Sequence, residues 1–270
     1  TTNKKITYII LLVYMKIASW NVNGIRARVE HVKHWLTTSR PDVLALQETK
    51  VVDDLFPFDA FESIGYQAVV FGQKAYNGVA LLTKNKTPQI SRGMDGFQDE
   101  QARVISADYK GIKIIDVYVP NGQSVGSEKF AYKIEWFSHL HRLIKQSLQA
   151  NNNLVVLGDF NIAPEDMDVY DPEAWKDKVL CSDQERTCLR SLLSLGLSDS
   201  FRLFEQPEEQ YSWWDYRAAA YRRKMGLRID LILLSDPVSK HCVSSTIDES
   251  PRGWEKPSDH TPVLVEIDIG

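Results

Sequence analysis

Leu154-Val155-Val156-Leu157-Gly158-Asp159-Phe160-Asn161 begins as four apolar residues and ends in glycine, an acid, an aromatic residue and an amide. The apolar run predicts a short buried strand. A strand that delivers Asp159 and Asn161 at its C-terminal end places two polar side chains where the core stops and a pocket begins. Taken alone, the same residues also fit a strand followed by an Asx-type turn, so the interpretation depends on the rest of the chain.

Other predicted strands carry polar side chains at their ends in the same way. Apolar stretches predict strands at residues 16–22, 43–46, 112–119, 229–235 and 262–267. The polar residues at or beside their ends are Asn21, Glu48, Tyr118, Asn121, Asp230, Asp259 and His260. Each has a structural explanation when considered singly: Asn21 could cap a helix, and Asp230 could pair with Arg228. Because open α/β sheets bind ligands beyond their strand ends, the whole set indicates a site.

The remaining patterns predict an α/β fold with mixed sheets. Strand pairs are predicted at 67–71 with 78–83, joined through the turn residues Asn77-Gly78, and at 103–107 with 112–119. Helical spacing predicts a long helix over 127–150, and a capping box at 182–185 begins another helix that Gly196 ends. Strands that alternate with helices and also pair as hairpins are typical of α/β layers. No linker interrupts the core patterns, which favours one domain.

Composition excludes some classes of function. The chain has 270 residues, 43% of them hydrophobic and 25% charged, with a net charge of −4. No whole-molecule field would draw it to DNA, so a nucleic-acid ligand requires a local basic face. The three cysteines form no CxxC pair, which argues against a disulfide framework and a zinc site and favours a reducing compartment. We expect a cytoplasmic monomer that does not bind membranes.

The first fourteen residues differ from the rest. Lys4 and Lys5 precede an apolar run at 6–14 that is too short to span a membrane and lacks a small-residue cleavage site. Met15 directly precedes the first strand pattern. We therefore expect residues 1–14 to be an N-terminal extension outside the native fold, and residues 15–270 to form the single domain.

The polar set fits metal-assisted phosphoester hydrolysis. Mg²⁺ prefers oxygen ligands and keeps several waters, so Glu48 with one aspartate would suffice to hold it. Hydrolysis also needs charge stabilisation at the phosphate oxygens and a placed water. A histidine paired with an aspartate is a tuned proton donor. The chain has no Gly-rich phosphate loop of the P-loop type, no HExxH and no GxSxG, which excludes those mechanisms.

At this point the chain resembles the exonuclease III family, the class II apurinic/apyrimidinic endonucleases of the endonuclease/exonuclease/phosphatase superfamily. The resemblance covers residue 15 to the C-terminus and rests on six motifs in the family's order. They are the segments 20–27 (WNVNGIRA), 46–50 (LQETK), 118–122 (YVPNG), 158–163 (GDFNIA), 227–230 (LRID) and 258–262 (SDHTP).

The resemblance implies a DNase I-like four-layer α/β/β/α sandwich of two packed mixed sheets, with the site at one edge of the sheets. It implies Mg²⁺, for which Mn²⁺ can substitute, bound chiefly by Glu48. The other residues it places at the metal are Asn21, Asp259, Asp159 and Asn161, with Asn23 behind them. Asp159 would activate the attacking water and Asn161 would orient it. The residues that would face the scissile phosphate are His260, held by Asp230, together with Tyr118 and Asn121.

The substrate has to be argued from the segment 211–228, because the superfamily also contains phosphatases of lipids and inositol phosphates. This segment interleaves aromatic residues with five basic ones and a single acid. Basic residues suit a phosphate backbone, and aromatic residues can fill the gap left by a missing base. An aromatic core strand beside a solvated basic turn is the alternative. Trp213 and Trp214 are candidates for an abasic pocket, and the other predicted DNA contacts are Arg217, Arg103, Lys129 and Lys176, with Lys133 and Lys178 as weaker ones.

The sequence therefore predicts a DNA repair nuclease that cuts the phosphodiester 5′ to abasic sites in duplex DNA. The resemblance adds 3′-5′ exonuclease activity and removal of 3′-blocking groups. Two alternatives stay open: a phosphatase of the same superfamily that acts on lipid or inositol phosphates, and a non-catalytic DNA-binding module with the same fold.

Overall fold

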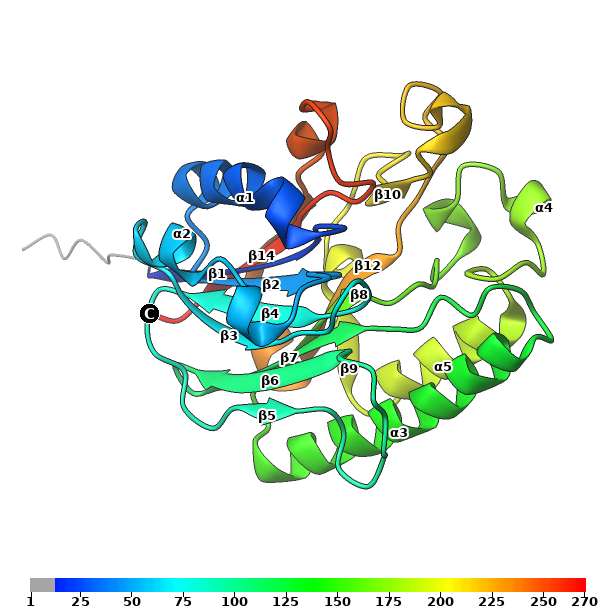
Figure 1. The fold of residues 1–270 in the computed structure, drawn as a ribbon. Coiled ribbons are helices and arrows are strands. Elements are labelled where there is room, and N and C mark those ends of the chain that lie inside the picture. The colour runs from blue at the N-terminus through cyan, green and yellow to red at the C-terminus, as the bar shows by residue number, and fades with distance from the viewer. Residues whose placement is uncertain (1–12) are drawn as a thin grey trace, which may run out of the picture.

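Two six-stranded sheets pack face to face, and helices cover both outer faces (Figure 1). The structure is a computed structural model, and it describes residues 13–270. The first sheet has the order β13 (Cys242–Ile247), β14 (Val263–Asp268), β1 (Tyr14–Asn21), β2 (Val43–Gln47), β4 (Val79–Thr83), β3 (Gln67–Phe71). The second has the order β5 (Ser91–Arg92), β6 (Val104–Tyr109), β7 (Ile112–Tyr118), β8 (Leu154–Asp159), β12 (Asp230–Ser235), β9 (Leu197–Asp199). A short ribbon pairs β10 (Trp213–Trp214) with β11 (Gly226–Leu227).

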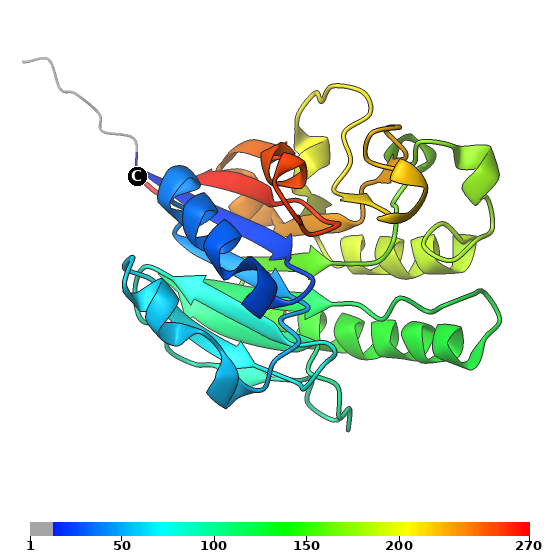
Figure 2. The ribbon, with the colours of Figure 1, turned by 45° about the horizontal axis from the view of Figure 1, so that its top comes forward.

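The helices form the outer layers. Those of the described chain are α1 (Ile25–Ser39), α2 (Phe58–Glu62), α3 (Glu128–Ala150), α4 (Pro172–Trp175), α5 (Asp183–Leu193) and α6 (Asp236–Ser239). Apolar residues of α1 and α2 pack on the first sheet, and those of α3 and α5 pack on the second. Another set of apolar residues, which includes Ile17, Ala45 and Val155, fills the space between the two sheets. Figure 2 shows these layers from a second side. The predicted four-layer sandwich is confirmed.

Local sequence signals explain where the long helices begin. The Ser127 hydroxyl accepts a hydrogen bond from the Phe130 amide at the start of α3. At the start of α5, Ser182 and Glu185 form the predicted capping box. Gly196, with a φ of 95°, follows α5 in the left-handed conformation that favours glycine. These signals are local, which is why they can be read without knowledge of the tertiary structure.

Strand register brings the ends of three strands of the second sheet together. β7 runs parallel to β8, β12 runs antiparallel to it, and both Tyr118 and Asp230 are register partners of Asp159. The chain reaches Asp159 through Gly158, whose φ is 143°. A Cβ at this glycine would lie 1.9 Å from the Val117 carbonyl oxygen, so only glycine lets β7 and β8 approach this closely.

The first strand begins two residues earlier than the predicted residue 16. Tyr14, which the sequence assigned to an extension, pairs with Asp268 in β1, and the Val13 carbonyl accepts a hydrogen bond from the Ile269 amide. Residues 1–12 of the predicted extension lie outside the described residues. Within residues 13–270, no helix is both long and apolar enough to cross a membrane.

Candidate active site

Two carboxylates, one from each sheet, meet at a shared asparagine. Asn21 is the last residue of β1, and its side-chain amide donates to Glu48 Oε1 and to Asp159 Oδ2, both at 2.9 Å. Asn21 is buried, and its own carbonyl accepts a hydrogen bond from the Ser258 hydroxyl. The amide thus fixes the separation of two acids that belong to different sheets.

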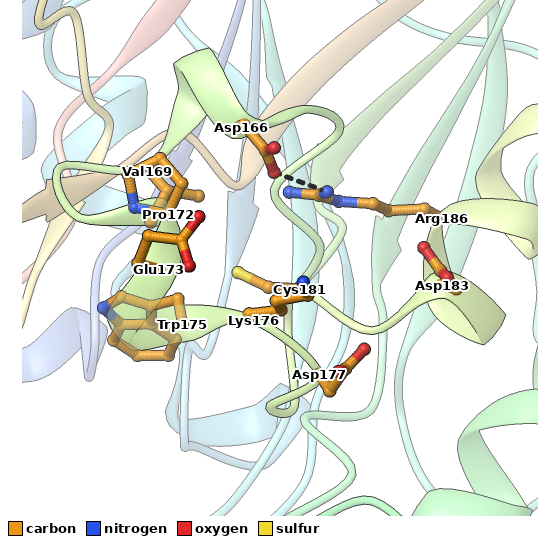
Figure 3. A pocket seen from close by; sticks show the side chains of 10 residues that line it. All are labelled: Asp166, Val169, Pro172, Glu173, Trp175, Lys176, Asp177, Cys181, Asp183 and Arg186. Atoms are coloured by element: carbon orange, nitrogen blue, oxygen red, sulfur yellow. Dashed lines mark hydrogen bonds and ion pairs between the residues drawn. The ribbon is translucent and has the colours of Figure 1, made fainter.

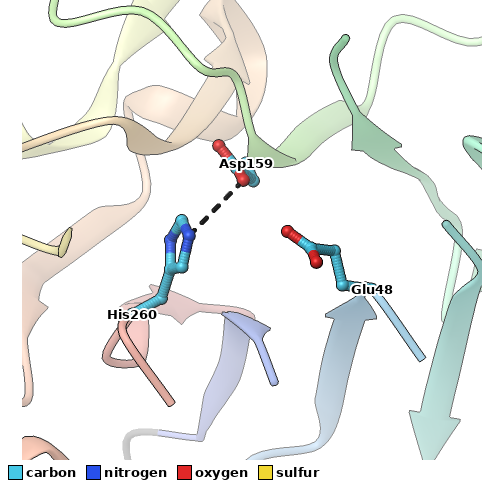
Figure 4. A group of neighbouring side chains, drawn as sticks. All are labelled: Glu48, Asp159 and His260. Atoms are coloured by element: carbon cyan, nitrogen blue, oxygen red, sulfur yellow. Dashed lines mark ion pairs between the residues drawn. The ribbon is translucent and has the colours of Figure 1, made fainter. Parts of the chain in front are cut away.

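His260 completes a cluster of possible metal ligands with these acids. One ligand atom from each of Glu48, Asp159 and His260 lies within 4.8 Å of the other two, and the three side chains point into the same space (Figure 4). His260 Nε2 is 3.7 Å from Asp159 Oδ2, while Nδ1 is 2.9 Å from Asp230 Oδ2. The predicted pairing of His260 with Asp230 is therefore present, and the alternative pairing of Asp230 with Arg228 is not.

A second group of polar residues lies beside Asp159. The Asn161 amide donates to Asp159 Oδ1 at 2.9 Å, and the Asn121 side chain donates to Asn161 Oδ1 at 3.2 Å. Tyr118 lies beneath the guanidinium of Arg103, whose Cζ is 4.7 Å from the ring centre. A hollow on this side of the site is lined by four of the predicted phosphate and DNA contacts, namely Arg103, Tyr118, Asn121 and Lys129.

Asp259 lies next to the carboxylate cluster but is held by other partners. Its side chain accepts from the Asn23 amide at 2.9 Å and from the Trp213 indole nitrogen at 3.1 Å. The Trp213 backbone also forms a bridge with His260. These contacts connect the aromatic segment to the site, with Trp213 half-buried at its rim.

Burial and neighbouring charges shift the pKa values of the site. Burial raises the pKa of Asp159 to about 7, and attraction to His260 offsets part of this effect. Burial alone would lower the pKa of His260, but Asp230 and Asp159 outweigh it and raise the pKa to about 10. Burial would raise the pKa of Glu48, but Lys50 and Asn21 outweigh it and lower the pKa. Near neutral pH the site therefore holds an ionised Glu48, a protonated histidine and an aspartic acid near its midpoint.

The phenol of Tyr118 stays neutral in this environment. Burial raises its pKa well above the ordinary value, and the nearby carboxylates Glu48 and Asp159 raise it further. A neutral phenol donates a hydrogen bond. The site as a whole thus combines carboxylate oxygens for a cation with hydrogen-bond donors for an anion, which is the combination that phosphoester chemistry needs.

Three predictions for basic or aromatic residues require correction. Trp214 is only 2% exposed and packs against Tyr211 and Tyr221, so its ring has no free face for a ligand, whereas Trp213 is half-buried. Arg228 is buried between two aspartates of the core, with its guanidinium 2.7 Å from each. Lys133 is fully buried in an ion pair with Glu185 and does not extend a basic face.

The remaining basic candidates lie on the surface. Arg217 is exposed and forms an ion pair with Asp215, and Arg222, Arg223 and Lys224 are exposed beside it. Lys176 is exposed at a separate hollow (Figure 3). That hollow also contains the carboxylates of Asp166, Glu173, Asp177 and Asp183, so Lys176 does not stand on an isolated basic face.

The sequence reasoning missed a role for Lys50. Its ammonium lies 2.7 Å from Glu48 Oε2 and 2.5 Å from Asn23 Oδ1, so it holds the carboxylate that the metal would use. The sequence could have indicated this contact, because Lys50 lies two residues after Glu48 in the LQETK segment. Ser212 is a second such residue, because its hydroxyl accepts from the amides of Ile229 and Asp230 and so positions the partner of His260.

This fold agrees with the comparisons with known proteins. The chain belongs to the endonuclease/exonuclease/phosphatase family, whose model matches residues 18–260. It is similar to exodeoxyribonuclease III of Haemophilus influenzae, with 37% identity over 94% of this chain and 100% of that protein.

Two solved structures are similar over nearly the whole chain. One is the 3′ phosphatase NExo from Neisseria bound to product DNA hairpin, with 42% identity, a TM-score of 0.92, and coverage of 94% of this chain and 99% of that one. The other is an AP endonuclease from Archaeoglobus fulgidus, with 38% identity, a TM-score of 0.91, and coverage of 94% of this chain and 100% of that one.

Proposed function

We propose that this protein is a DNA repair nuclease. It hydrolyses the phosphodiester 5′ to abasic sites in duplex DNA, degrades DNA from 3′ ends and removes 3′-blocking groups. The observation that carries the proposal is the convergence of Glu48, Asp159 and the Asp230-paired His260 at the edge of the two sheets. Relatives named as an exodeoxyribonuclease, a 3′ phosphatase and an AP endonuclease support the same reaction class.

The residues present fit a Mg²⁺ ion, with Mn²⁺ as a substitute. Glu48 and Asp159 offer carboxylate oxygens that share the Asn21 amide, and the Lys50 ammonium on Glu48 indicates that this carboxylate attracts a cation. We assign Glu48 as the chief ligand, with Asn21, Asp159, Asn161 and Asp259 around it. When bound, the ion supplies positive charge against the charge that develops on the phosphate oxygens.

The other side chains of the site activate the water and bind the phosphate. Asp159 accepts the proton of the attacking water, and its pKa of about 7 suits a general base near neutral pH. Asn161 orients that water from its position beside Asp159. His260, kept protonated by Asp230, donates a hydrogen bond to the phosphate. Tyr118 and Asn121 donate to the same phosphate from the other side, and the neutral phenol stands near the leaving oxygen.

The DNA lies across both sides of this cluster. Trp213 packs against the abasic sugar, because it is the aromatic residue at the rim and is tied to Asp259. The phosphate backbone contacts Arg217, Arg103 and Lys129, with Lys176 as a further contact. The Neisseria relative was solved bound to product DNA hairpin, which supports DNA as the ligand of this protein. The three cysteines are free, which supports a cytoplasmic protein, and we propose that it acts as a monomer.

A substrate panel tests the proposal. The purified protein would be incubated in Mg²⁺ with an abasic duplex, a 3′-phosphorylated duplex, an inositol polyphosphate and a phosphorylated lipid in vesicles. Cleavage of the two DNA substrates alone is expected. Release of phosphate from the inositol or lipid substrate without DNA cleavage would show that the protein is a phosphatase of the same superfamily and not a nuclease. Tight DNA binding with no cleavage would indicate a non-catalytic module.

A further inference from the structure

A buried lysine lies directly beneath the two loops that carry Asn121 and Asn161. Lys133 is on α3, is fully buried and has its Nζ within hydrogen-bond distance of three oxygens. These are the Asn161 carbonyl at 2.7 Å, the Asn121 carbonyl at 3.1 Å and Glu185 Oε1 at 2.5 Å. An ammonium has three donors, so every one of them has a partner.

Glu185 holds the other end of this arrangement. Its carboxylate accepts hydrogen bonds from the amides of Leu180 and Ser182 as well as from Lys133. The Leu180 carbonyl in turn accepts from the Ala163 amide, two residues beyond Asn161. The pair therefore joins α3, the start of α5 and both loops of the site through directional bonds.

The surrounding chain is shaped to admit this lysine. Gly122 has a φ of 91°, and a Cβ built on it would lie 3.0 Å from Lys133 Cδ. A glycine next to Asn121 therefore allows the loop to close over the lysine side chain. The two asparagines are also bonded to each other, so a shift in either carbonyl would move both side chains.

Stability alone is a poor explanation for the pair. Desolvation of two charges offsets most of their attraction, and apolar residues of similar size often replace a buried ion pair with no loss of stability. We propose that Lys133, together with Glu185, is a positioning residue that sets the place of Asn121 and Asn161 at the scissile phosphate. This inference rests on the proposed function, because the two asparagines have their roles there.

The test compares a variant of the ion pair with a control variant on the same helix. The variant with Lys133→Met and Glu185→Gln removes both charges and leaves no unpaired ion in the core. Ile144→Ala is the control, because it removes buried apolar atoms from the same helix about three turns away from Lys133. Melting temperature, kcat and KM on an abasic duplex, and the ¹⁵N signals of the Asn121 and Asn161 side-chain amides would be measured for both.

We expect the double variant to lose kcat by about tenfold or more with little change in KM, since a misplacement of about 1 Å can cost about 100-fold. Its two asparagine amide signals should move, while those of the Ile144→Ala variant stay in place. Unmoved signals, or a kcat of the double variant no lower than that of the Ile144→Ala variant when both are measured below their melting temperatures, would overturn the inference. If the wild-type protein cleaves no DNA, the proposed function fails, and the amide signals alone decide the positioning role.

Discussion

Asp159 takes its chemical character from its surroundings. It is fully buried, accepts hydrogen bonds from Asn21 and from the Asn161 amide, and faces His260. Burial raises its pKa to about 7, whereas an exposed aspartate has a pKa near 3.9. The result is an acid whose proton affinity suits proton transfer near neutral pH. Its neighbours come from both sheets, so this environment exists only in the folded chain.

Asp159→Asn should lower turnover by about 10²–10⁴-fold, because an amide of the same shape cannot accept the proton of the attacking water. DNA affinity should change little, since the substitution keeps the size and removes a negative charge. Single-turnover cleavage of an abasic duplex and fluorescence anisotropy with the same DNA would measure the two effects. Wild-type turnover of this variant would show that Asp159 is not the general base.

Trp213→Ala should weaken cleavage of abasic DNA by about 1–3 kcal/mol in kcat/KM through the loss of packing on the sugar. Trp214→Ala provides the contrast, because this neighbour is buried and should mainly lower the melting temperature. Kinetics and thermal unfolding of both variants would separate the roles. A Trp213 variant that loses only thermal stability would show that Trp213 is a core residue.

At the level of elements, the site depends on how β7, β8 and β12 lie side by side. Their register places Tyr118, Asp159 and Asp230 in one row. The close approach of β7 and β8 requires Gly158, where a Cβ would overlap the Val117 carbonyl. The glycine before Asp159 is thus a requirement of strand packing.

Gly158→Ala should destabilise the protein by about 3 kcal/mol or more, the combined cost of a strained backbone and an overpacked contact. Gly253→Ala is a matched control, because no atom lies within 4 Å of its added Cβ. Urea unfolding of the two variants would give the difference. Equal stability of the two variants would contradict the packing explanation.

Strand ends and helix starts could be predicted from sequence because their signals are local. The lateral order of the strands could not, so the choice between Arg228 and His260 as the partner of Asp230 stayed open until the sheets were in place. Lys133 looked like a solvated helical lysine because Glu185 is distant in the chain. Trp213 and Trp214 were indistinguishable, since successive strand residues face opposite sides and the register was unknown.

At the scale of the whole molecule, the two sheets meet across a buried polar contact beneath the site. The Gln47 side chain of one sheet donates to Asp116 of the other at 2.7 Å. Gln47 Oε1 and Asp116 Oδ2 have no hydrogen-bond partner. Burial raises the pKa of Asp116 well above its ordinary value, with the hydrogen bond from Gln47 as a smaller opposing effect. A neutral acid with a proton on Oδ2 is the state that suits this contact.

This raised pKa predicts a pH-dependent stability. The contribution of Asp116 is fully present below its unfolded pKa of about 3.9 and is lost as the pH rises toward and through the higher folded pKa. Asp116→Asn should therefore stabilise the protein at neutral and alkaline pH more than at pH 4, because the amide has no proton to lose. Denaturant unfolding of both proteins across this range would measure the difference. A difference that is constant with pH would contradict the prediction.

The proposed DNA-binding surface is a small basic region on a protein of negative net charge. The net charge is −4, yet four basic residues within eleven positions of Trp213 in the sequence are exposed, two of them in ion pairs: Arg217, Arg222, Arg223 and Lys224. A duplex that contacts these residues would present its backbone to the carboxylate cluster.

The most direct test of this account is a cleavage assay on a 5′-labelled duplex with one stable abasic analogue at a known position. It would be run with Mg²⁺ and, separately, with EDTA. We expect a cut immediately 5′ to the analogue in Mg²⁺, with progressive shortening of the 3′ ends by the proposed exonuclease, and no cleavage product in EDTA. An uncut strand in Mg²⁺, or a cut that persists in EDTA, would contradict the assignment of Glu48, Asp159 and His260 as a metal-dependent nuclease site.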